Sequence, residues 1–389
     1  MDITITPRLL RGDIRVIPSK SIAHRYLICT ALADNPTQIR CEDTNRDIEA
    51  TADCLRSLGA DIIRTETGYT VFPISKVPET AVLNCCESGS TLRFMLPIAG
   101  ALGVDATFIM AGRLPQRPLS PLWEEMERMG CSLTRPTENT LRCTGKLQPG
   151  TYTIDGGVSS QYITGLLFAL SLIDRETELF VSGKIESQPY IAMTEEAMAI
   201  FRSPHYHSPG TITVEGDWSN GAFWITAQFL NNPLSVQGLN AISSQGDRAI
   251  VTHLSSMGSA APTIDVSDIP DLVPIMAVAA AAQNGAGFTN IQRLRLKESD
   301  RVATVIDMIS NLGGHAEATE DTLRVYGTGL RGGTVDSHND HRIAMAAAIA
   351  ATVCQEPVTI IGAEAVNKSY PKFWEEYRRL GGNYEQHIR

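Results

Sequence analysis

Residues 338–354 read HNDHRIAMAAAIAATVC, a short polar segment that runs directly into a long apolar one. From Ile343 to Cys354 almost every position is apolar, so a helix over this stretch has no polar face to turn to water. A helix that is hydrophobic all round must be buried. The stretch therefore predicts a helix inside the fold, with its charged and polar residues gathered at its start near Asp340.

The same arrangement occurs five more times along the chain. The other polar starts lie near Ser21, Ser90, Ser160, Ser219 and Asp271, and the apolar bodies that follow them read LICTALA, TLRFMLPIAGAL, YITGLLFALSLI, AFWITAQFL and LVPIMAVAAAA. Because each body is apolar nearly all round, six buried helices are expected.

A second type of helix alternates with the buried type and is amphipathic. It is predicted over Asp47–Leu58, Pro121–Met129 and Ser299–Leu312, with apolar residues at helical spacing and charge on the other face. Glycine is common just past a helix end because it adopts the left-handed conformation at little cost. Helix ends are accordingly predicted at the Leu-Gly and Met-Gly pairs closed by Gly59, Gly130, Gly258, Gly313 and Gly381, with a degenerate sixth copy at 199–205.

Short alternating segments between the helices predict strands with one face toward solvent, for example Tyr69–Phe72, Thr151–Ile154, Thr211–Val214 and Leu323–Tyr326. The repeating unit is therefore strand, buried helix, strands, surface helix and strand, and six copies fill the 389 residues. We expect an α/β fold of two domains, each with three βαββαβ-type units and with its buried helices behind the sheets. The expected segments are 18–216 for one domain and 1–17 with 217–389 for the other.

The charge balance excludes some classes of partner. The chain has 43 acidic and 33 basic side chains and a formal net charge of −10. General binding to nucleic acid or to an anionic membrane needs a basic surface, so we expect neither partner. No apolar window reaches the roughly 20 residues that a membrane helix needs.

The cysteine pattern indicates a reducing compartment. Eight cysteines are scattered along the chain without a C-x-x-C pair, which favours neither a zinc site nor a disulfide framework. The N-terminal stretch alternates apolar and polar residues and lacks the apolar core of a signal peptide. A cytoplasmic location is therefore expected.

The starts of the buried helices concentrate groups that bind anions. A helix N-terminus offers unpaired N–H groups and a partial positive charge. Lys20, Arg25, Arg93 and Arg342 lie at or near these starts and would add charge-assisted hydrogen bonds to phosphate or carboxylate. Two further basic segments, 111–118 and 293–301, extend the pattern. The expected ligand is a small anion.

Taken in order along the chain, these motifs resemble the enolpyruvyl transferase family, and within it the branch that acts on shikimate 3-phosphate. The matching elements are Ser19–Arg25, Gly89–Arg93, Arg117-Pro118, Val158–Gln161, Ser187–Tyr190, Ile269–Asp271, Lys297–Arg301, Asn339–Arg342 and Lys368. The resemblance implies a two-domain inside-out α/β barrel. It also implies that segment 18–216 carries the shikimate 3-phosphate side, and that the other domain carries the catalytic aspartate and much of the phosphoenolpyruvate site.

The implied reaction transfers the enolpyruvyl group of phosphoenolpyruvate to the 5-hydroxyl of shikimate 3-phosphate through a tetrahedral ketal that expels phosphate. By resemblance, Asp271 is the proton acceptor, and either Glu298 or Lys20 protonates C3. The implied contacts to shikimate 3-phosphate are Lys20, Ser21, Arg25, Ser159, Ser160, Gln161, Ser187, Asp271 and Lys297. The implied contacts to phosphoenolpyruvate are Lys20, Gly89, Arg117, Gln161, Arg301, Arg342 and Lys368. No cofactor or metal is implied, and we expect a monomer.

Two alternatives are weighed against this interpretation. A sister transferase that acts on UDP-N-acetylglucosamine typically carries a reactive cysteine in the loop before its Arg-Pro element, and Ala111–Pro118 contains none. A metal hydrolase using His338 and His341 lacks a Cys or Glu cluster to complete its ligands. Arg293 stands where better-known members of the family have an asparagine, so its contact to the substrate is left open.

Overall fold

The computed structural model describes residues 1–173 and 176–387, and the chain in it forms two compact units. Pro18–Glu215 make up the central unit, and Met1–Ile17 with Gly216–Arg389 make up the terminal unit. Each is described by itself. Among the described residues, no helix combines the length and the apolar character needed to cross a membrane.

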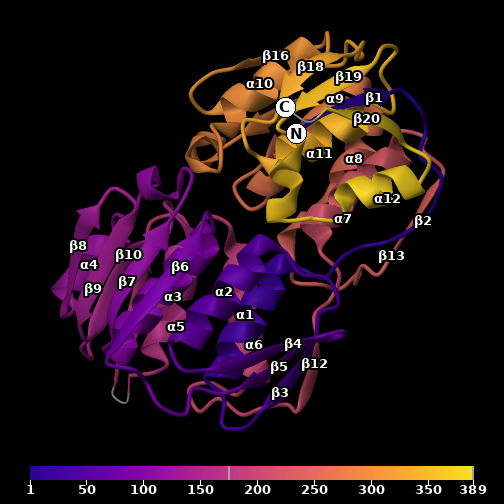
Figure 1. The fold of residues 1–389 in the computed structure, drawn as a ribbon. Helices are drawn as coiled ribbons and strands as arrows, with labels where there is room; N and C mark the ends of the chain where they lie inside the picture. The colour runs from indigo at the N-terminus through magenta and orange to yellow at the C-terminus, as the bar shows by residue number, and fades with distance from the viewer. Residues whose placement is uncertain (174–175, 388–389) are drawn as a thin grey trace. The chain divides into compact units, whose positions relative to one another are not determined.

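The central unit has three buried helices, three outer helices and three sheets (Figure 1). The buried helices are α1 (Lys20–Ala31), α3 (Gly89–Leu102) and α5 (Ser160–Leu170), and the outer helices are α2 (Arg46–Ser57), α4 (Leu122–Arg128) and α6 (Gln188–Ile200). In sheet order the strands are β12 (Thr211–Thr213), β3 (Thr37–Arg40), β5 (Gly68–Phe72) and β4 (Asp61–Thr65); β6 (Thr80–Cys86), β7 (Asp105–Met110), β9 (Thr140–Gly145) and β8 (Cys131–Thr137); and β10 (Thr151–Asp155) with β11 (Glu178–Ser182). A 3₁₀ turn, η1 (Leu114–Gln116), precedes α4.

The terminal unit repeats the plan. Its buried helices are α7 (Trp218–Phe229), α9 (Val273–Ala282) and α11 (His341–Ala350), and its outer helices are α8 (Ile250–Ser259), α10 (Arg301–Asn311) and α12 (Phe373–Arg379). In sheet order the strands are β18 (Gly333–Asp336), β19 (Val358–Ile361), β1 (Asp2–Thr6) and β20 (Asn383–His387); β14 (Thr263–Asp265), β15 (Ala286–Thr289), β17 (Thr322–Tyr326) and β16 (His315–Ala318); and β13 (Leu234–Gln237) with β2 (Gly12–Arg15). The 3₁₀ turns are η2 (Gly246–Ala249), η3 (Pro270–Leu272), η4 (Gln292–Leu296) and η5 (Ala363–Lys368).

The six buried helices predicted from the apolar runs are confirmed. Every residue of α11 is buried, and so are nine of the ten in α9, from Val273 to Ala281. In the terminal unit α7, α9 and α11 contact one another, and the sheets lie outside them (Figure 1). The sheets can cover the helices because alternate strand residues point inward. In register, Ile264 of β14 faces Phe288 of β15, which faces Leu323 of β17, and all three are buried.

The sheets of the two units follow one pattern, but two of them have fewer strands than the sequence repeat predicts. In each four-stranded sheet of the described chain a parallel pair is extended by two antiparallel strands. A buried helix joins the parallel strands in the pairs β6–β7, β14–β15 and β18–β19, whereas β12 and β3 come from distant parts of the sequence. Within the described residues, the pairs β10–β11 and β13–β2 have no such extension. Their units have the buried and the outer helix but two strands instead of four. The expectation of six equivalent units therefore holds for the helices and for four of the sheets.

Four of the five glycine helix ends are confirmed, and one is wrong. Gly59, Gly130, Gly313 and Gly381 follow their helices with φ between +81° and +107°. Gly258 instead lies inside α8, which ends one residue later at Ser259. Pro262 follows closely, and a proline disfavours helical backbone at the residue before it, so this helix stops without a left-handed glycine.

The close packing of α3 against α5 depends on Gly165. A Cβ at this position would lie 2.1 Å from the Arg93 carbonyl oxygen and 3.1 Å from Pro97 Cγ. Pro97 has no N–H to donate to the Arg93 carbonyl four residues earlier in α3. A glycine on α5 lets the two helices approach at this carbonyl.

We expect Gly165→Ala to destabilise the protein by about 1–3 kcal/mol, because the added methyl group forces backbone apart in a packed core. Gly258→Ala is the matched control, since its Cβ would meet Phe229 at an ordinary 3.4 Å. That variant should have unchanged stability, or gain up to about 1 kcal/mol from the lower helix cost of alanine. Urea unfolding monitored by circular dichroism measures both, and equal stabilities would contradict the close-approach argument.

Candidate active site

The starts of the three buried helices of the terminal unit meet at Arg342. This residue is the second of α11, and its backbone N–H is capped by Asp340 at 2.9 Å. Its Nη2 donates to Asp271 Oδ2 at 3.0 Å and to Ser219 Oγ at 3.3 Å, and its Nη1 donates to the Asp271 carbonyl at 3.2 Å. Asp271 lies in η3 just before α9, and Ser219 lies in the first turn of α7. One guanidinium thus connects the polar starts of α7, α9 and α11.

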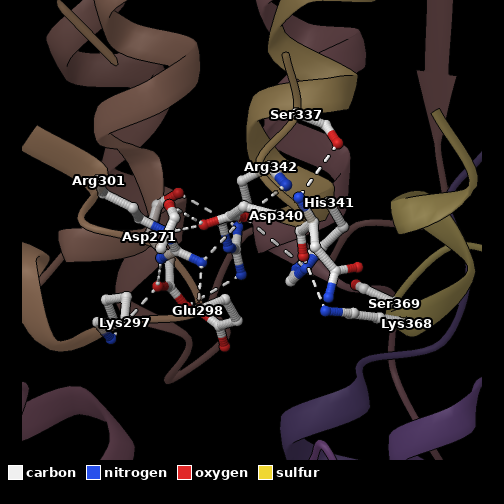
Figure 2. A network of polar contacts seen from close by, with 12 residues as sticks. Asp271, Lys297, Glu298, Arg301, Ser337, Asp340, His341, Arg342, Lys368 and Ser369 are labelled. Atoms are coloured by element: carbon white, nitrogen blue, oxygen red, sulfur yellow. Dashed lines mark hydrogen bonds and ion pairs between the residues drawn. The ribbon is translucent and has the colours of Figure 1, made fainter. Parts of the chain in front are cut away.

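A second guanidinium, that of Arg301, lies between three carboxylates. Arg301 begins α10 and is 1% exposed. Its Nε donates to Asp340 at 2.8 Å, its Nη1 to Asp271 at 2.6 Å and its Nη2 to Glu298 at 2.7 Å, as Figure 2 shows. Burial acts to lower the pKa of Arg301, but the attraction of Asp340, Glu298 and Asp271 outweighs burial and raises the pKa well above its usual range.

Asp271 is the carboxylate that both arginines share, and Lys297 Nζ lies 3.4 Å from its Oδ1. Burial acts to raise the pKa of Asp271, but Arg342, Lys297 and Arg301 outweigh it and hold that pKa well below its usual range. Burial lowers the pKa of Lys297 to about 8. The site therefore contains an ionised aspartate with three cationic neighbours.

Lys368 lies at the edge of this network. It ends η5 and is 8% exposed, and its Nζ donates to the Asn339 carbonyl at 2.7 Å (Figure 2). His338 and Asn339 both have positive φ, 49° and 56°, in the turn that leads into α11. Non-glycine residues rarely adopt this conformation, and it is typical of functional sites. The turn presents a backbone carbonyl to Lys368 directly before Asp340.

The central unit gathers a second set of polar helix starts. Arg93 of α3 donates through Nη1 to Gln161 Oε1 at 2.8 Å, and Gln161 Nε2 donates to Ser90 Oγ at 2.9 Å. These contacts connect the first turns of α3 and α5. At the start of α1, Lys20 Nζ forms an ion pair with Asp47 of α2 at 2.9 Å. Ser159 caps α5 by accepting from the Gln161 N–H at 3.3 Å, and Ser160 is the first residue of that helix.

Gly89 and Arg117 lie close together in the central unit. A Cβ on Gly89 would stand 2.6 Å from Arg117 Nη1 and 2.6 Å from Arg93 Nη1. Gly89 is the first residue of α3, and Ser88 caps the helix through the Thr91 N–H at 3.2 Å. The missing side chain therefore lets two guanidinium groups lie directly against the N-terminus of α3.

Arg25 is placed differently from the other candidates. It is 2% exposed, and its guanidinium donates to the Ser21 carbonyl at 2.7 Å, to Thr194 Oγ1 at 2.9 Å and to the Tyr190 carbonyl at 2.6 Å. The bonds to Thr194 and Tyr190 tie α1 to α6, and the bond to Ser21 stays within α1. Ser187 is buried at the N-cap of α6 with φ 56°. Arg293 lies in η4, outside the hydrogen bonds described above.

Sequence reasoning missed the carboxylates that hold the basic residues. Asp47 pairs with Lys20, and Asp340 pairs with Arg301, yet neither was assigned a role. Asp340 lies in the matching motif Asn339–Arg342, so the sequence shows its position but does not show that its partner is Arg301. Asp247 was missed altogether, because it lies in the irregular segment around η2, where no periodic pattern marks it.

The metal-hydrolase alternative has no ligand set in the part of the chain that the structure describes. Within it, no three His, Cys, Asp or Glu side chains are grouped so that they could hold a metal ion. His338 is exposed, whereas His341 is 2% exposed at the start of α11.

Comparison with solved structures first identifies the class of fold. EPSP synthase from Acinetobacter baumannii superposes with a TM-score of 0.78 at 23% identity, over 99% of this chain and 100% of that one. The enolpyruvyl transferase NikO from Streptomyces tendae superposes with a TM-score of 0.77 at 15% identity, over 99% and 98%. The fold is thus that of the enolpyruvyl transferases, and the expected two-domain α/β architecture is confirmed.

The family follows from the sequence matches. The family model described as EPSP synthase (3-phosphoshikimate 1-carboxyvinyltransferase) matches residues 5–377. Relatives named 3-phosphoshikimate 1-carboxyvinyltransferase, from Clostridium kluyveri and Clostridium acetobutylicum, are each 36% identical over 99% of this chain and 98% of their own length. The chain belongs to the EPSP synthase family, and the resemblance drawn from the motifs is confirmed.

The buried Arg301 leads to a stability prediction. We expect Asp340→Asn to lower the free energy of unfolding by about 3–5 kcal/mol at pH 7, because it removes one partner of a buried ion pair. Attraction to Arg301 outweighs burial and holds the pKa of Asp340 below its usual value. Its stabilisation is therefore present above the pKa of the unfolded chain and is lost as the pH falls through the lower folded pKa. The difference between the two proteins should shrink in acid.

The control is Asp53→Asn, which breaks the exposed pair of Asp53 and Arg56 on α2. An exposed pair contributes less than about 1 kcal/mol, so this variant should match the wild type. Denaturant unfolding at pH 7 and at about pH 3, below the ordinary aspartate pKa of about 3.9, measures all three proteins. A cost for Asp340→Asn as small as that of the control would contradict the role given to Arg301.

Proposed function

We propose an assignment of residue roles within the reaction of this family. The chain is an enolpyruvyl transferase of the shikimate pathway, and it moves the enolpyruvyl group of phosphoenolpyruvate to the 5-hydroxyl of shikimate 3-phosphate with release of phosphate. The observation that carries the assignment is the position of Asp271, a carboxylate with Arg342, Arg301 and Lys297 around it at the start of α9. The addition step needs a base, an acid and stabilisation of anions, and this cluster brings them together.

In the terminal unit, Asp271 is assigned as the acceptor of the 5-hydroxyl proton, and Lys297 as a contact to shikimate 3-phosphate. Glu298, on the other side of Arg301, is assigned to the proton at C3, a role that Lys20 of the central unit could share. Arg301, Arg342 and Lys368 are assigned to phosphoenolpyruvate. Arginine suits this task because its planar fork binds carboxylate and phosphate through two hydrogen bonds.

In the central unit, the proposed contacts follow the helix starts. Lys20, Gly89, Arg117 and Gln161 are assigned to phosphoenolpyruvate. Lys20 and Gln161 are assigned to shikimate 3-phosphate as well, together with Ser21, Arg25, Ser159, Ser160 and Ser187. These roles are supported by the two guanidinium groups that lie against Gly89 and by the contact of Gln161 with Arg93. For Arg25 the three hydrogen bonds within the unit leave two N–H groups for a ligand.

The charges around Asp271 explain how it would work as a base. With Arg301, Arg342 and Lys297 beside it, Asp271 is ionised, but its pKa is too low for effective proton abstraction near neutral pH. Anionic substrates that bind these cations would neutralise part of their field. The pKa of Asp271 would then rise, because fewer positive charges would stabilise its ionised form. Substrate binding itself would therefore activate the base.

We also infer a cytoplasmic monomer whose partners are its two small-molecule substrates. The scattered cysteines support the location, since proteins of oxidising compartments more often pair theirs. The net charge of −10 is unfavourable for nucleic acid or anionic lipid as a partner.

The test of the assignment is the release of phosphate from phosphoenolpyruvate, measured with and without shikimate 3-phosphate. We expect release only with both substrates, and a kcat for Asp271→Asn lower by about 10²–10⁴-fold, the usual contribution of a general base. Asp307→Asn, on the exposed face of α10, is the matched control and should keep the wild-type rate. Release without shikimate 3-phosphate, or a wild-type kcat for Asp271→Asn, would defeat the assignment.

Gly89 offers a second test that concerns phosphoenolpyruvate alone. Gly89→Ala should displace the guanidinium groups of Arg117 and Arg93, since its Cβ would lie 2.6 Å from each. We expect the KM for phosphoenolpyruvate to rise about tenfold or more, the effect of losing one charge-assisted hydrogen bond, while the KM for shikimate 3-phosphate changes less. Steady-state kinetics with each substrate varied in turn separates the two. Equal effects on both constants would argue against placing phosphoenolpyruvate at Gly89.

A further inference from the structure

A loop that plays no part in the assigned chemistry lies against the start of α7. Gln245 accepts from the Trp218 N–H at 3.0 Å and donates to the Gly216 carbonyl at 2.8 Å. It thereby fixes η2, which packs on α7 and α8. Two residues later, Asp247 is 3% exposed. The loop therefore brings one more carboxyl group into the interior at the helix start that carries Ser219.

The carboxyl group of Asp247 is connected to the site through Ser219. Ser219 Oγ donates to Asp247 Oδ2 and accepts from Arg342 Nη2 at 3.3 Å. The same Nη2 donates to Asp271 Oδ2 at 3.0 Å. Asp247 Oδ1 is buried and has no hydrogen-bond partner among the residues that the structure describes. A buried carboxylate oxygen without a partner is costly when the group is ionised, and less costly when it is neutral.

The charges that face Asp247 come from three neighbouring elements: Asp271 from η3, Arg342 from α11 and Asp217 from the cap of α7. Its own turn adds Arg248, whose Nη1 donates to the Ala241 carbonyl, and α8 carries His253, whose pKa burial lowers. Burial, and next the charge of Asp271, raise the pKa of Asp247 to about 7 against the opposing effects of Arg342 and Ser219. Burial and the charge of Asp271 therefore favour the protonated, neutral form of Asp247.

We propose that Asp247 is a positioning residue which, in its protonated form, holds the Ser219 hydroxyl and leaves the Arg342 guanidinium to Asp271 and to the substrate. The inference rests on the roles proposed above for Asp271 and Arg342. When Asp247 loses its proton, a second carboxylate stands one hydroxyl group away from Arg342 and competes with Asp271 for it. The site then has one negative charge more, which disfavours an anionic ligand. Activity should therefore fall as Asp247 ionises.

The first experiment compares kcat/KM for phosphoenolpyruvate at pH 6 and pH 7.5, with shikimate 3-phosphate saturating. If the protonated form is the competent one, a pKa of about 7 lowers the wild-type value about fourfold over this range. Asp247→Asn has the same shape and cannot ionise, so its value should change less than twofold. Lys297, with its pKa of about 8, is present in both proteins and contributes equally to both ratios.

The second experiment observes the proton itself. Infrared titration of the wild-type protein should show a carboxylic acid band that disappears as the pH rises through 7, and Asp247→Asn should lack that band. Glu125→Gln is the matched control. It removes another buried carboxyl, paired with Arg128 at 2.6 Å in the central unit, and should keep both the band and the wild-type ratio of kcat/KM.

The outcomes separate this inference from the assignment on which it rests. A wild-type protein without such a band overturns the inference even if Asp247→Asn does not fold, because it needs only the native chain. A band that titrates in the wild type, together with equal pH ratios in the wild type and Asp247→Asn, also overturns it. Failure of shikimate-dependent phosphate release would instead defeat the assigned function, whatever the infrared result.

Discussion

The architecture of both units depends on six buried helices that are apolar nearly all round. A helix such as α9, buried from Val273 to Ala281, cannot present a charged residue anywhere along its length without stranding that charge in the core. The charged side chains of these helices therefore lie toward the N-terminal ends, as Arg93 and Arg342 do. At the N-terminal ends the backbone offers unpaired N–H groups and partial positive charge, which favour anions. Packing that is required for stability thus also fixes where anion chemistry takes place.

Several cationic side chains at these helix ends are buried, and neighbouring carboxylates neutralise their charge. Arg301 is 1% exposed, and a guanidinium that far from water is tolerated only with close partners. Asp271, Glu298 and Asp340 supply them within 2.8 Å. Asp340 also caps α11 through the Arg342 N–H, so one carboxylate stabilises a helix end and a buried cation together. The strained turn at His338 and Asn339 lies directly before it, where these contacts offset its cost.

The sequence allowed the helices and the candidate residues to be predicted, because both depend on local patterns. An apolar run such as the one from Ile343 to Cys354 predicts a buried helix from its own composition, and α11 covers this run as far as Ala350. The helix end predicted at Gly258 was wrong because a nearby proline ends α8 without a left-handed residue. The two short sheets were missed because a helix–strand repeat predicts the unit but not the number of its strands. The carboxylates that pair with the cations could not be predicted, for another reason. The pairs Lys20–Asp47 and Arg301–Asp340 join residues 27 and 39 positions apart, and only the tertiary fold sets such distances.

The partners of the cations also decide which ligands the site can accept. In the terminal unit Lys368 is paired with a backbone carbonyl, and Arg342 and Lys297 are paired with Asp271. A ligand that binds these groups exchanges one partner for another, so it gains only the difference between two interactions. A singly charged or neutral molecule gains little from that exchange. A phosphorylated acid, with several negative oxygens in fixed geometry, can replace more than one partner at once. The internal pairs therefore select for multiply charged anions, in a chain whose net charge of −10 would otherwise repel them.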